Sequence, residues 1–340
     1  MTDETTERLE PEYRPRKYVS VSTLTSYSRC PRKYFYEKNG LRSDSLQLNP
    51  TYGSAMHEAV PVALETEDLE LSLEAFLSIW TDVEKEIEIR GIDPKKHNRH
   101  NAARSLQHFI FTHAGRKSIY KLQPPPEGGL ERDETTSPYE VPWAIDIGER
   151  VPLAGRLDGI CTHRDTGEPW VWELKTTGMY LNSQFFDAHE MYTQNLTYAL
   201  VSQTSLDVPA AGVIIEGMLV HDKKVDNQCQ MIPIQPHHLE DVLLWLQRTT
   251  RSLLEGEEMY ADLLIKHDGD ANAAALAFPK DFTGCTPYTH YYRPGWRCDF
   301  ADLCRVPDWR ALSDLYKVVP DHDFLKVTVE GGDVKQPNVN

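Results

Sequence analysis

Residues 153–177 read LAGRLDGICTHRDTGEPWVWELKTT, and this stretch decides what kind of sheet the chain can build. Apolar residues dominate 151–164 and 169–177, and the turn residues DTGE lie between them, which predicts two strands joined in a hairpin. Successive side chains of a strand point to opposite faces. Glu173 and Lys175 therefore share one face, Trp172 and Leu174 share the other, and Asp158 can face the first pair across the ladder.

Two carboxylates and an amine gathered at one point suit hydrolysis of a phosphodiester. Asp158 and Glu173 would hold Mg²⁺ or Mn²⁺ through oxygen, the ion would acidify a bound water, and Lys175 would orient that water. A Glu-x-Lys triplet also arises by chance, and exposed cross-strand charge pairs are the alternative. The apolar flanks of Glu173 indicate a central strand, where an unpaired charge is costly and usually functional.

Further candidates lie on predicted helices. Residues 182–204, NSQFFDAHEMYTQNLTYALVSQT, predict one long helix on which Gln194 and Tyr198 share a face. An amide and a phenol there could bind a phosphate or a nucleotide edge, and ordinary amphipathic surface is the alternative. His57, in GSAMHEA, lies on an apolar helical pattern, where a core histidine and a functional histidine both stay open.

The spacing of apolar residues in the other segments predicts helices and strands that form a single mixed α/β core, with a cysteine-bearing appendage. A pair of short helices is expected in residues 19–42, the first capped by Ser22 and the second opened by Pro31. Helices follow at 53–64, interrupted by Pro61, and at 69–91 and 95–115. The turn-rich linker 124–138 precedes a strand at 139–147. Strands at 210–220 and 228–235 and a helix at 236–258 complete the pattern.

Composition and charge limit the class of protein. Of the 340 residues, 40% are hydrophobic, and no apolar run approaches the roughly 18 to 20 residues of a membrane span. The first residues lack the apolar core of a signal peptide, so a cytoplasmic protein is expected. The net charge of −16 disfavours a protein that merely coats nucleic acid. Between Tyr13 and Arg42, however, eight cations and several aromatic residues accompany one acid, Glu37. This segment is either a basic face that attracts a polyanion or a basic helix pair packed by its aromatic residues.

The six cysteines fall into two groups. Cys161 and Cys229 lie in apolar, strand-like stretches and are expected to be inert core thiols. The other four lie near the two ends of the chain: Cys30, Cys285, Cys298 and Cys304. Soft thiolates in a reducing compartment suit an iron–sulfur cluster or zinc. Zinc in the same four cysteines, or three free thiols with a buried Cys30, are the alternatives. The lack of a C-x2-4-C pair favours the cluster.

Taken in order, these motifs resemble a known family. SVSTLTSYSRCPRKYFY, GSAMHEA, GRLDGI, WELKTT, QNLTYAL and the terminal cysteines are similar to RecB-type nucleases of the PD-(D/E)xK superfamily. The likeness is greatest to the CRISPR-associated Cas four exonucleases and their phage-encoded relatives. It implies an α/β fold with a restriction-endonuclease-like mixed sheet core flanked by helices, and a cysteine-ligated iron–sulfur appendage formed by both termini.

The resemblance also implies a role for each candidate residue. The implied metal ligands are His57, Asp158, Glu173 and the backbone carbonyl of Leu174. The implied catalytic residues are Asp158, Glu173, Lys175, Gln194 and Tyr198. The implied ligands of a [4Fe–4S] cluster are Cys30, Cys285, Cys298 and Cys304. Gly295 stands where the family has the first cysteine of a C-x2-C pair, so Cys285 would supply that ligand from farther away.

The resemblance implies a Mg²⁺- or Mn²⁺-dependent DNA exonuclease acting at single-stranded ends, with 5′ to 3′ polarity as one option. Its setting would be recombination, repair or CRISPR-type spacer processing in a phage or prokaryote. A DNA-end-binding subunit that assists an integrase or helicase is the alternative, and an RNA nuclease is a third. The expected organisation is a flexible N-terminus 1–15, a helical segment 16–50, a nuclease core 51–265, an iron–sulfur region 266–325 and a flexible tail 326–340.

Overall fold

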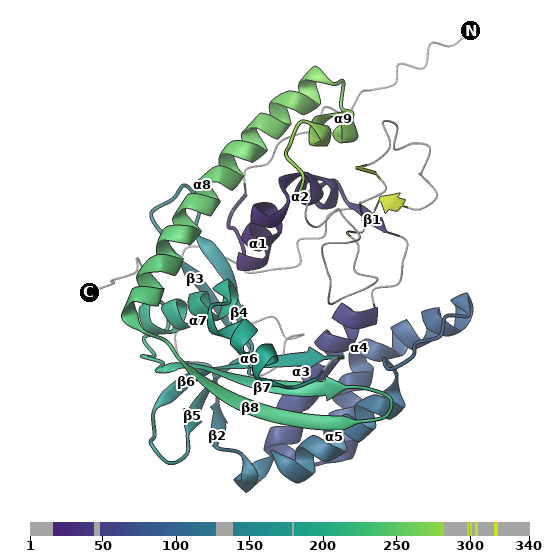
Figure 1. The fold of residues 1–340 in the computed structure, drawn as a ribbon, viewed down its shortest axis with the longest axis vertical. Helices are drawn as coiled ribbons and strands as arrows, with labels where there is room; N and C mark the ends of the chain where they lie inside the picture. The colour runs from purple at the N-terminus through teal and green to yellow at the C-terminus, as the bar shows by residue number, and fades with distance from the viewer. Residues whose placement is uncertain are drawn as a thin grey trace. The chain divides into compact units, whose positions relative to one another are not determined.

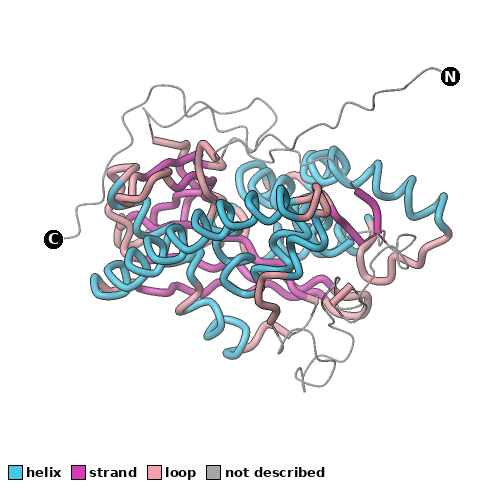
Figure 2. Tube along the Cα trace, turned by 90° about the horizontal axis from the view of Figure 1, so that it is seen from above, coloured by secondary structure: helices cyan, strands magenta, loops and turns pink. Residues whose placement is uncertain are grey.

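The computed structural model describes residues 16–43, 48–126, 139–178, 180–281, 298, 300, 303–304 and 316–318 (Figure 1). The chain divides into two compact units. The first, which we call the helical unit, comprises Met1–Ser45, Glu149–Val151 and Leu246–Phe324. The second, the sheet unit, comprises Leu46–Gly148, Pro152–Trp245 and Leu325–Asn340. Figure 2 traces the helices and strands of both units.

The helical unit begins with the expected pair of short helices. α1 (Val21–Arg29) is capped by Ser20, whose hydroxyl accepts from the Thr23 N–H at 3.2 Å, so the cap lies two residues before the expected Ser22. α2 (Pro31–Lys38) begins at Pro31 as expected, because proline needs no N–H partner in the first turn. The unit also contains the C-terminal part of α8 (Pro236–Lys266), α9 (Ala271–Leu276), and β1 (Leu41–Ser43) paired antiparallel with β9 (Tyr316–Val318).

The sheet unit is built on five strands in the order β2-β5-β6-β7-β8. Their bounds are β2 Tyr120–Gln123, β5 Gly159–His163, β6 Pro169–Thr177, β7 Gly212–Val220 and β8 Val225–Pro233. β6 and β7 run parallel and every other neighbouring pair is antiparallel. A parallel pair needs a crossover, which here contains α6 (Ser183–Glu190) and α7 (Thr193–Thr204). β3 (Val141–Ile145) and β4 (Leu153–Leu157) form a separate antiparallel pair.

The predicted hairpin around DTGE is confirmed as β5 and β6. Gly167 takes the left-handed conformation that this turn requires, with φ +73°. The strand predicted over 151–164 is instead two strands, β4 and β5, separated at Asp158. The helix predicted over 182–204 is likewise two helices, separated at Met191 and Tyr192. Both breaks fall beside the candidate site residues.

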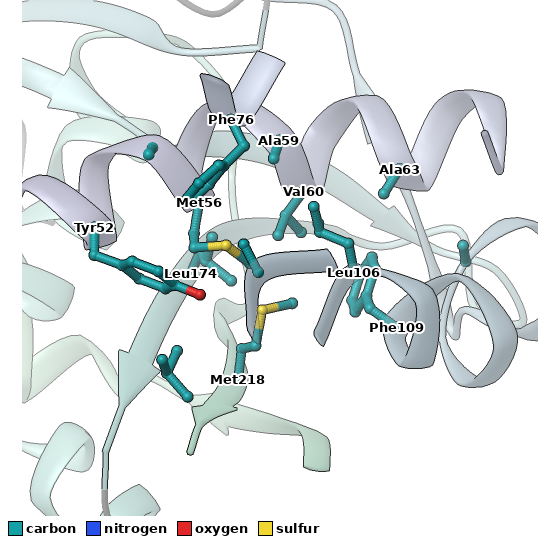
Figure 3. Close-up of a cluster of buried hydrophobic side chains, with 14 of the residues drawn as sticks. Tyr52, Met56, Ala59, Val60, Ala63, Phe76, Leu106, Phe109, Leu174 and Met218 are labelled. Carbon is teal, nitrogen blue, oxygen red and sulfur yellow. The ribbon is translucent and has the colours of Figure 1, made fainter. Parts of the chain in front are cut away.

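Three helices pack on one face of the five-stranded sheet through a continuous apolar core (Figure 3). They are α3 (Leu48–Thr66), α4 (Leu69–Arg90) and α5 (Arg99–Thr112). Pro61 lies inside α3 without ending it, contrary to the expected interruption, and its neighbours Val60 and Ala63 are fully buried. Trp172 and Leu174 point into this core, so Glu173 and Lys175 point to the opposite face, as the alternation predicts.

The mixed α/β class expected from the sequence is confirmed, and the mixed sheet flanked by helices is consistent with a restriction-endonuclease-like core. Within the described ranges, none of the helices combines the length and apolar character needed to cross a membrane.

Candidate functional site

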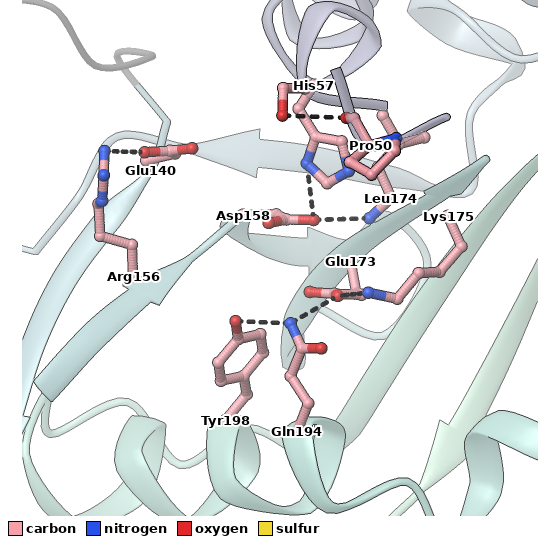
Figure 4. A network of polar contacts seen from close by, with 11 residues as sticks. Pro50, His57, Glu140, Arg156, Asp158, Glu173, Leu174, Lys175, Gln194 and Tyr198 are labelled. Carbon is pink, nitrogen blue, oxygen red and sulfur yellow. Dashed lines mark hydrogen bonds and ion pairs between the residues drawn. The ribbon is translucent and has the colours of Figure 1, made fainter. Parts of the chain in front are cut away.

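Asp158 lies where the chain leaves one sheet and enters the other. β4 pairs with β3 and ends at Leu157, whereas β5 begins at Gly159 and pairs with β2 and β6. The sequence predicted that Asp158 lies on a strand of the hairpin. It lies instead in the break between two strands. Its Oδ2 accepts a hydrogen bond from the Leu174 N–H on β6 at 3.0 Å (Figure 4). The break turns this carboxylate toward the middle of β6.

His57 reaches the same carboxylate from α3. Its Nδ1 lies 3.2 Å from Asp158 Oδ2. Burial lowers the pKa of His57, but the charge of Asp158, the hydrogen bond to it and the charge of Glu173 together raise it more, so the net shift is upward. Burial raises the pKa of Asp158, but the charge and hydrogen bond of His57, the charge of Lys175 and the Leu174 N–H together lower it more, so its net shift is downward. The two groups thus favour each other's charged forms.

Glu173 is fully buried, and among the described residues only one of its two carboxylate oxygens has a hydrogen-bond partner. Its Oε1 accepts from Lys175 Nζ and, at 3.1 Å, from Gln194 Nε2. Its Oε2 is buried and has no hydrogen-bond partner among the described residues. Burial and the nearby charge of Asp158 raise the pKa of Glu173 to about 7, against the opposing effect of Lys175. Burial lowers the pKa of Lys175, but Glu173 and Asp158 raise it more, so the amine stays charged at neutral pH.

The face predicted for Gln194 and Tyr198 turns toward Glu173. Both lie on α7, and Gln194 Nε2 also donates to the Tyr198 hydroxyl at 2.7 Å. Burial raises the pKa of Tyr198 well above its ordinary value, so this phenol is neutral. One amide therefore fixes both a carboxylate oxygen and a phenol (Figure 4). The structure thus brings together the seven sheet-unit residues predicted for the site, Leu174 through its backbone and the others through their side chains.

Sequence reasoning missed a second charged pair beside this group. Arg156 Nη1 donates to Glu140 Oε2 at 2.9 Å. Burial raises the pKa of Glu140, Arg156 lowers it, and Asp158 raises it again, which places the pair near the candidate site. Arg156 lies two residues before Asp158, but its partner precedes a different strand. The pairing of Pro142 with Arg156 brings them together, and no local pattern indicates that register.

The donor set fits a hard divalent cation. Asp158 and Glu173 offer carboxylate oxygens, and the unpartnered Glu173 Oε2 is a buried oxygen that needs a positive neighbour. In the described part of the chain, however, no three His, Cys, Asp or Glu side chains are already gathered as a metal-ligand group. Lys175 donates to Glu173 Oε1, and Asp158 Oδ2 lies against His57 Nδ1 and accepts from the Leu174 N–H.

Three of the four terminal cysteines, Cys30, Cys298 and Cys304, lie in one neighbourhood of the helical unit. Cys30 caps α2, and its Sγ accepts from the Lys33 and Asp281 N–H groups, each at 3.4 Å. Burial raises the pKa of Cys304, the charge of Arg32 and a hydrogen bond from it lower the pKa, and Cys298 and Cys30 raise it again. Three of the four predicted cluster ligands are therefore close enough to affect one another. Cys285 lies outside the described residues.

The other two cysteines lie in strands of the sheet unit, Cys161 on β5 and Cys229 on β8. Burial raises the pKa of both thiols, which suits the inert role expected for them.

The basic N-terminal segment is largely engaged within the helical unit. Arg16 Nε and Lys38 Nζ contact Glu257 Oε1 at 2.7 and 2.6 Å. Glu257 is buried, and these two cations lower its pKa against the effect of burial. The aromatic residues Tyr34, Phe35 and Tyr36 are also buried. Of the two interpretations of this segment, the structure favours a helix pair packed by its aromatic residues.

One known protein family matches most of the chain. The family model described as the PD-(D/E)XK nuclease superfamily matches residues 18–305. No curated protein matches the chain. Among solved structures, the chain is similar to "Crystal structure of SSO0001", at 14% sequence identity over 70% of this chain and 78% of that one. The TM-score is 0.29, which is too low to support an argument about the fold.

Proposed function

This chain belongs to the PD-(D/E)XK nuclease superfamily, and from that premise we propose that it is a Mg²⁺- or Mn²⁺-dependent DNA exonuclease acting at single-stranded ends. Membership implies metal-dependent nuclease activity. The choice of DNA, of free ends and of the RecB-type, Cas four branch rests on the sequence motifs. The observation that supports the proposal most is the buried, unpartnered Glu173 Oε2 beside a charged Lys175.

The residues that would hold the ion are Asp158, Glu173, His57 and the backbone carbonyl of Leu174. A divalent cation bound there would stabilise negative charge on the phosphate and lower the pKa of a bound water. Glu173 has a pKa of about 7 and is neutral at lower pH, and the charge of Asp158 helps to raise the pKa of His57. Protons therefore compete with the ion for both side chains. Binding of the ion is therefore expected to weaken as pH falls below 7.

The protein's own residues supply the remaining chemistry. The Lys175 ammonium is held by Glu173 and keeps its charge in a buried setting, where an electrostatic contact with a phosphate oxygen or an attacking water is strong. Gln194 holds Glu173 Oε1 in place and is itself held at the Tyr198 hydroxyl. Gln194 and Tyr198 thus position the carboxylate and stand beside the expected path of the substrate.

We also propose that Cys30, Cys285, Cys298 and Cys304 ligate a [4Fe–4S] cluster with a structural role. Support comes from the proximity of three of these thiols and from the two backbone N–H groups aimed at Cys30 Sγ, a contact that favours a thiolate. Anaerobically purified protein should contain iron and sulfide and absorb near ~400 nm, and Cys30→Ser should remove that absorption. Stoichiometric zinc without iron would refute the cluster.

The alternative of a DNA-end-binding assembly subunit, whose nuclease activity is subordinate to an integrase or helicase, is not favoured. That alternative drew on the basic N-terminal segment, in which Arg16 and Lys38 are paired with Glu257. Integrase-like or helicase-like partners, and a place in repair or spacer processing, stay part of the proposal as settings for the same nuclease.

The test is degradation of end-labelled DNA with Mg²⁺ or Mn²⁺, comparing single-stranded, duplex and RNA substrates with 5′ or 3′ ends blocked. Glu173→Gln and Lys175→Met preserve side-chain size and should each lower kcat/KM by at least about 100-fold. Glu86→Gln, which removes a carboxylate on α4 that pairs with its helix neighbour Arg90, is the matched control. Undiminished cleavage by both site variants would refute the assignment.

A further inference from the structure

The segment that follows β6 carries an unusual set of aromatic and apolar side chains, which we call the α6 wall. It comprises Tyr180, Phe185, His189, Met191 and Tyr192. Phe185 and His189 rings contact edge to face at 5.0 Å, and His189 and Tyr192 at 5.8 Å. Tyr180 before α6 is 73% exposed and Met191 after it is 58% exposed. Large apolar side chains exposed at both ends of an eight-residue helix indicate a site that binds a ligand or partner.

Gly217 fixes this wall beside the catalytic lysine. In the parallel pair of β6 and β7, Gly217 lies directly alongside Lys175. A Cβ on Gly217 would lie 2.8 Å from Leu181 Cδ2 and 3.1 Å from Phe185 Cε1. The start of α6 therefore packs closely onto the strand next to Lys175, and a side chain at Gly217 would displace Leu181 and Phe185.

The ring contacts from Phe185 through His189 to Tyr192 continue the wall beyond Gly217, and both His189 and Tyr192 interact electrostatically with Lys175. Burial lowers the pKa of His189 to about 4, and the charge of Lys175 lowers it further. Tyr192 in turn helps to raise the pKa of Lys175. His189 is thus a neutral ring, and its Nδ1 is buried without a hydrogen-bond partner among the described residues. A neutral aromatic ring presents a face that can stack without a charge to desolvate.

The charges on α6 decide which part of a nucleic acid it can face. The helix reads SQFFDAHE, in which the exposed Asp187 and Glu190 are acidic and His189 is neutral. Acidic side chains repel phosphates, whereas Lys175 attracts them. A strand with a phosphate at Lys175 would therefore turn its backbone away from α6 and its bases toward the aromatic rings.

We propose that the α6 wall stacks against an unpaired base of the substrate strand, next to the phosphate that is cleaved at Lys175. This inference rests on the proposed function. It assigns Tyr180 and His189 as specificity-determining residues and Gly217 as a positioning residue. A paired base has both faces covered by its neighbours in the duplex, so the wall selects nucleotides that have left the stack.

The experiment uses single-stranded oligonucleotides carrying one abasic nucleotide at successive positions from the cleaved bond. For the wild type, kcat/KM should fall by about 5- to 100-fold at one position and stay unchanged elsewhere, as loss of one stacked base predicts. Tyr180→Ala and His189→Ala should lower kcat/KM on the intact strand by a similar factor and show little further loss on the abasic strand. Phe111→Ala, which removes a ring of matched exposure (75%) on α5, should keep the full abasic penalty.

Binding separates this inference from the nuclease assignment. With Glu173→Gln protein, the Kd for intact and abasic strands should differ by the same factor without any cleavage. The stacking inference alone would be refuted if kcat/KM were the same at every abasic position. It would also be refuted if both wall variants kept the full loss of kcat/KM on the abasic strand. Base-dependent binding without cleavage by the wild type would overturn the nuclease assignment alone. Gly217→Ala should shift α6 and remove the abasic penalty while leaving the fold intact by circular dichroism.

Discussion

Glu216 offers a test of how the interior beneath the site is stabilised. It lies on β7 alongside Leu174, is fully buried, and accepts a hydrogen bond from the Tyr120 hydroxyl at 2.8 Å. Its Oε1 has no partner among the described residues. Burial raises the pKa of Glu216 from 4.5 to about 8, against the smaller lowering effect of the Tyr120 hydrogen bond. The carboxyl is therefore protonated in the folded protein at neutral pH.

The sign of the pH dependence follows from proton binding in the two states. Between pH 4.5 and 8 the unfolded chain has lost the Glu216 proton and the folded protein has kept it, so folding takes up a proton and stability falls as pH rises. Each tenfold step in this equilibrium is worth about 1.4 kcal/mol. From pH 5 to pH 8 the wild type should therefore lose about 3 kcal/mol of unfolding free energy through this group.

Glu216→Gln keeps the shape of the side chain and removes the titration. Urea unfolding at pH 5, 6, 7 and 8 should show the variant gaining about 3 kcal/mol on the wild type over that range. Tyr120→Phe keeps the carboxyl but removes its donor, so the decline in stability should extend to higher pH. Parallel stability curves for wild type and Glu216→Gln would refute the conclusion that Glu216 is buried as the neutral acid.

Two further predictions concern the site and the β3–β4 pair. Gln194→Ala removes the donor to Glu173 and should lower kcat by about 10- to 100-fold, as loss of a hydrogen bond to a charged group predicts, while Gln203→Ala on the same helix should leave kcat unchanged. Gly155→Ala places a Cβ 2.7 Å from Trp143 Cζ2, and because Trp143 is buried, urea unfolding should show a loss of about 1 to 3 kcal/mol. Unchanged cleavage by Gln194→Ala, or an unchanged urea midpoint for Gly155→Ala, would contradict these contacts.

Local periodicity was enough to predict most of the secondary structure and half of the site. Alternation along a strand places Glu173 and Lys175 on one face, and helical spacing places Gln194 and Tyr198 on one face, whatever the rest of the chain does. The helix over 69–91 was equally readable, because Asp68 and Gly91 mark its ends as α4. These features depend on the geometry of a few consecutive residues, which the order of amino acids specifies directly.

The breaks in this pattern depended on packing between distant segments. Nothing local divides 151–164 at Asp158; the division arises because β4 pairs with β3 while β5 pairs with β2 and β6. The second break, at Met191 and Tyr192, separates α6 from α7, and the start of α6 packs against Gly217 of β7, which is distant along the chain. Such choices depend on which strands meet, a long-range outcome that periodicity does not encode.

The sequence by itself determined the residue types and the faces on which they lie: two carboxylates, an amine, an amide and a phenol within a mixed α/β chain. Only the tertiary structure decided how they meet. It set Asp158 in a gap between two sheets, left one oxygen of Glu173 buried without a partner, and turned the cations Arg16 and Lys38 inward to Glu257. The physical reason is that the charge state and the burial of a side chain depend on the residues around it in space. Most of those residues are distant along the chain.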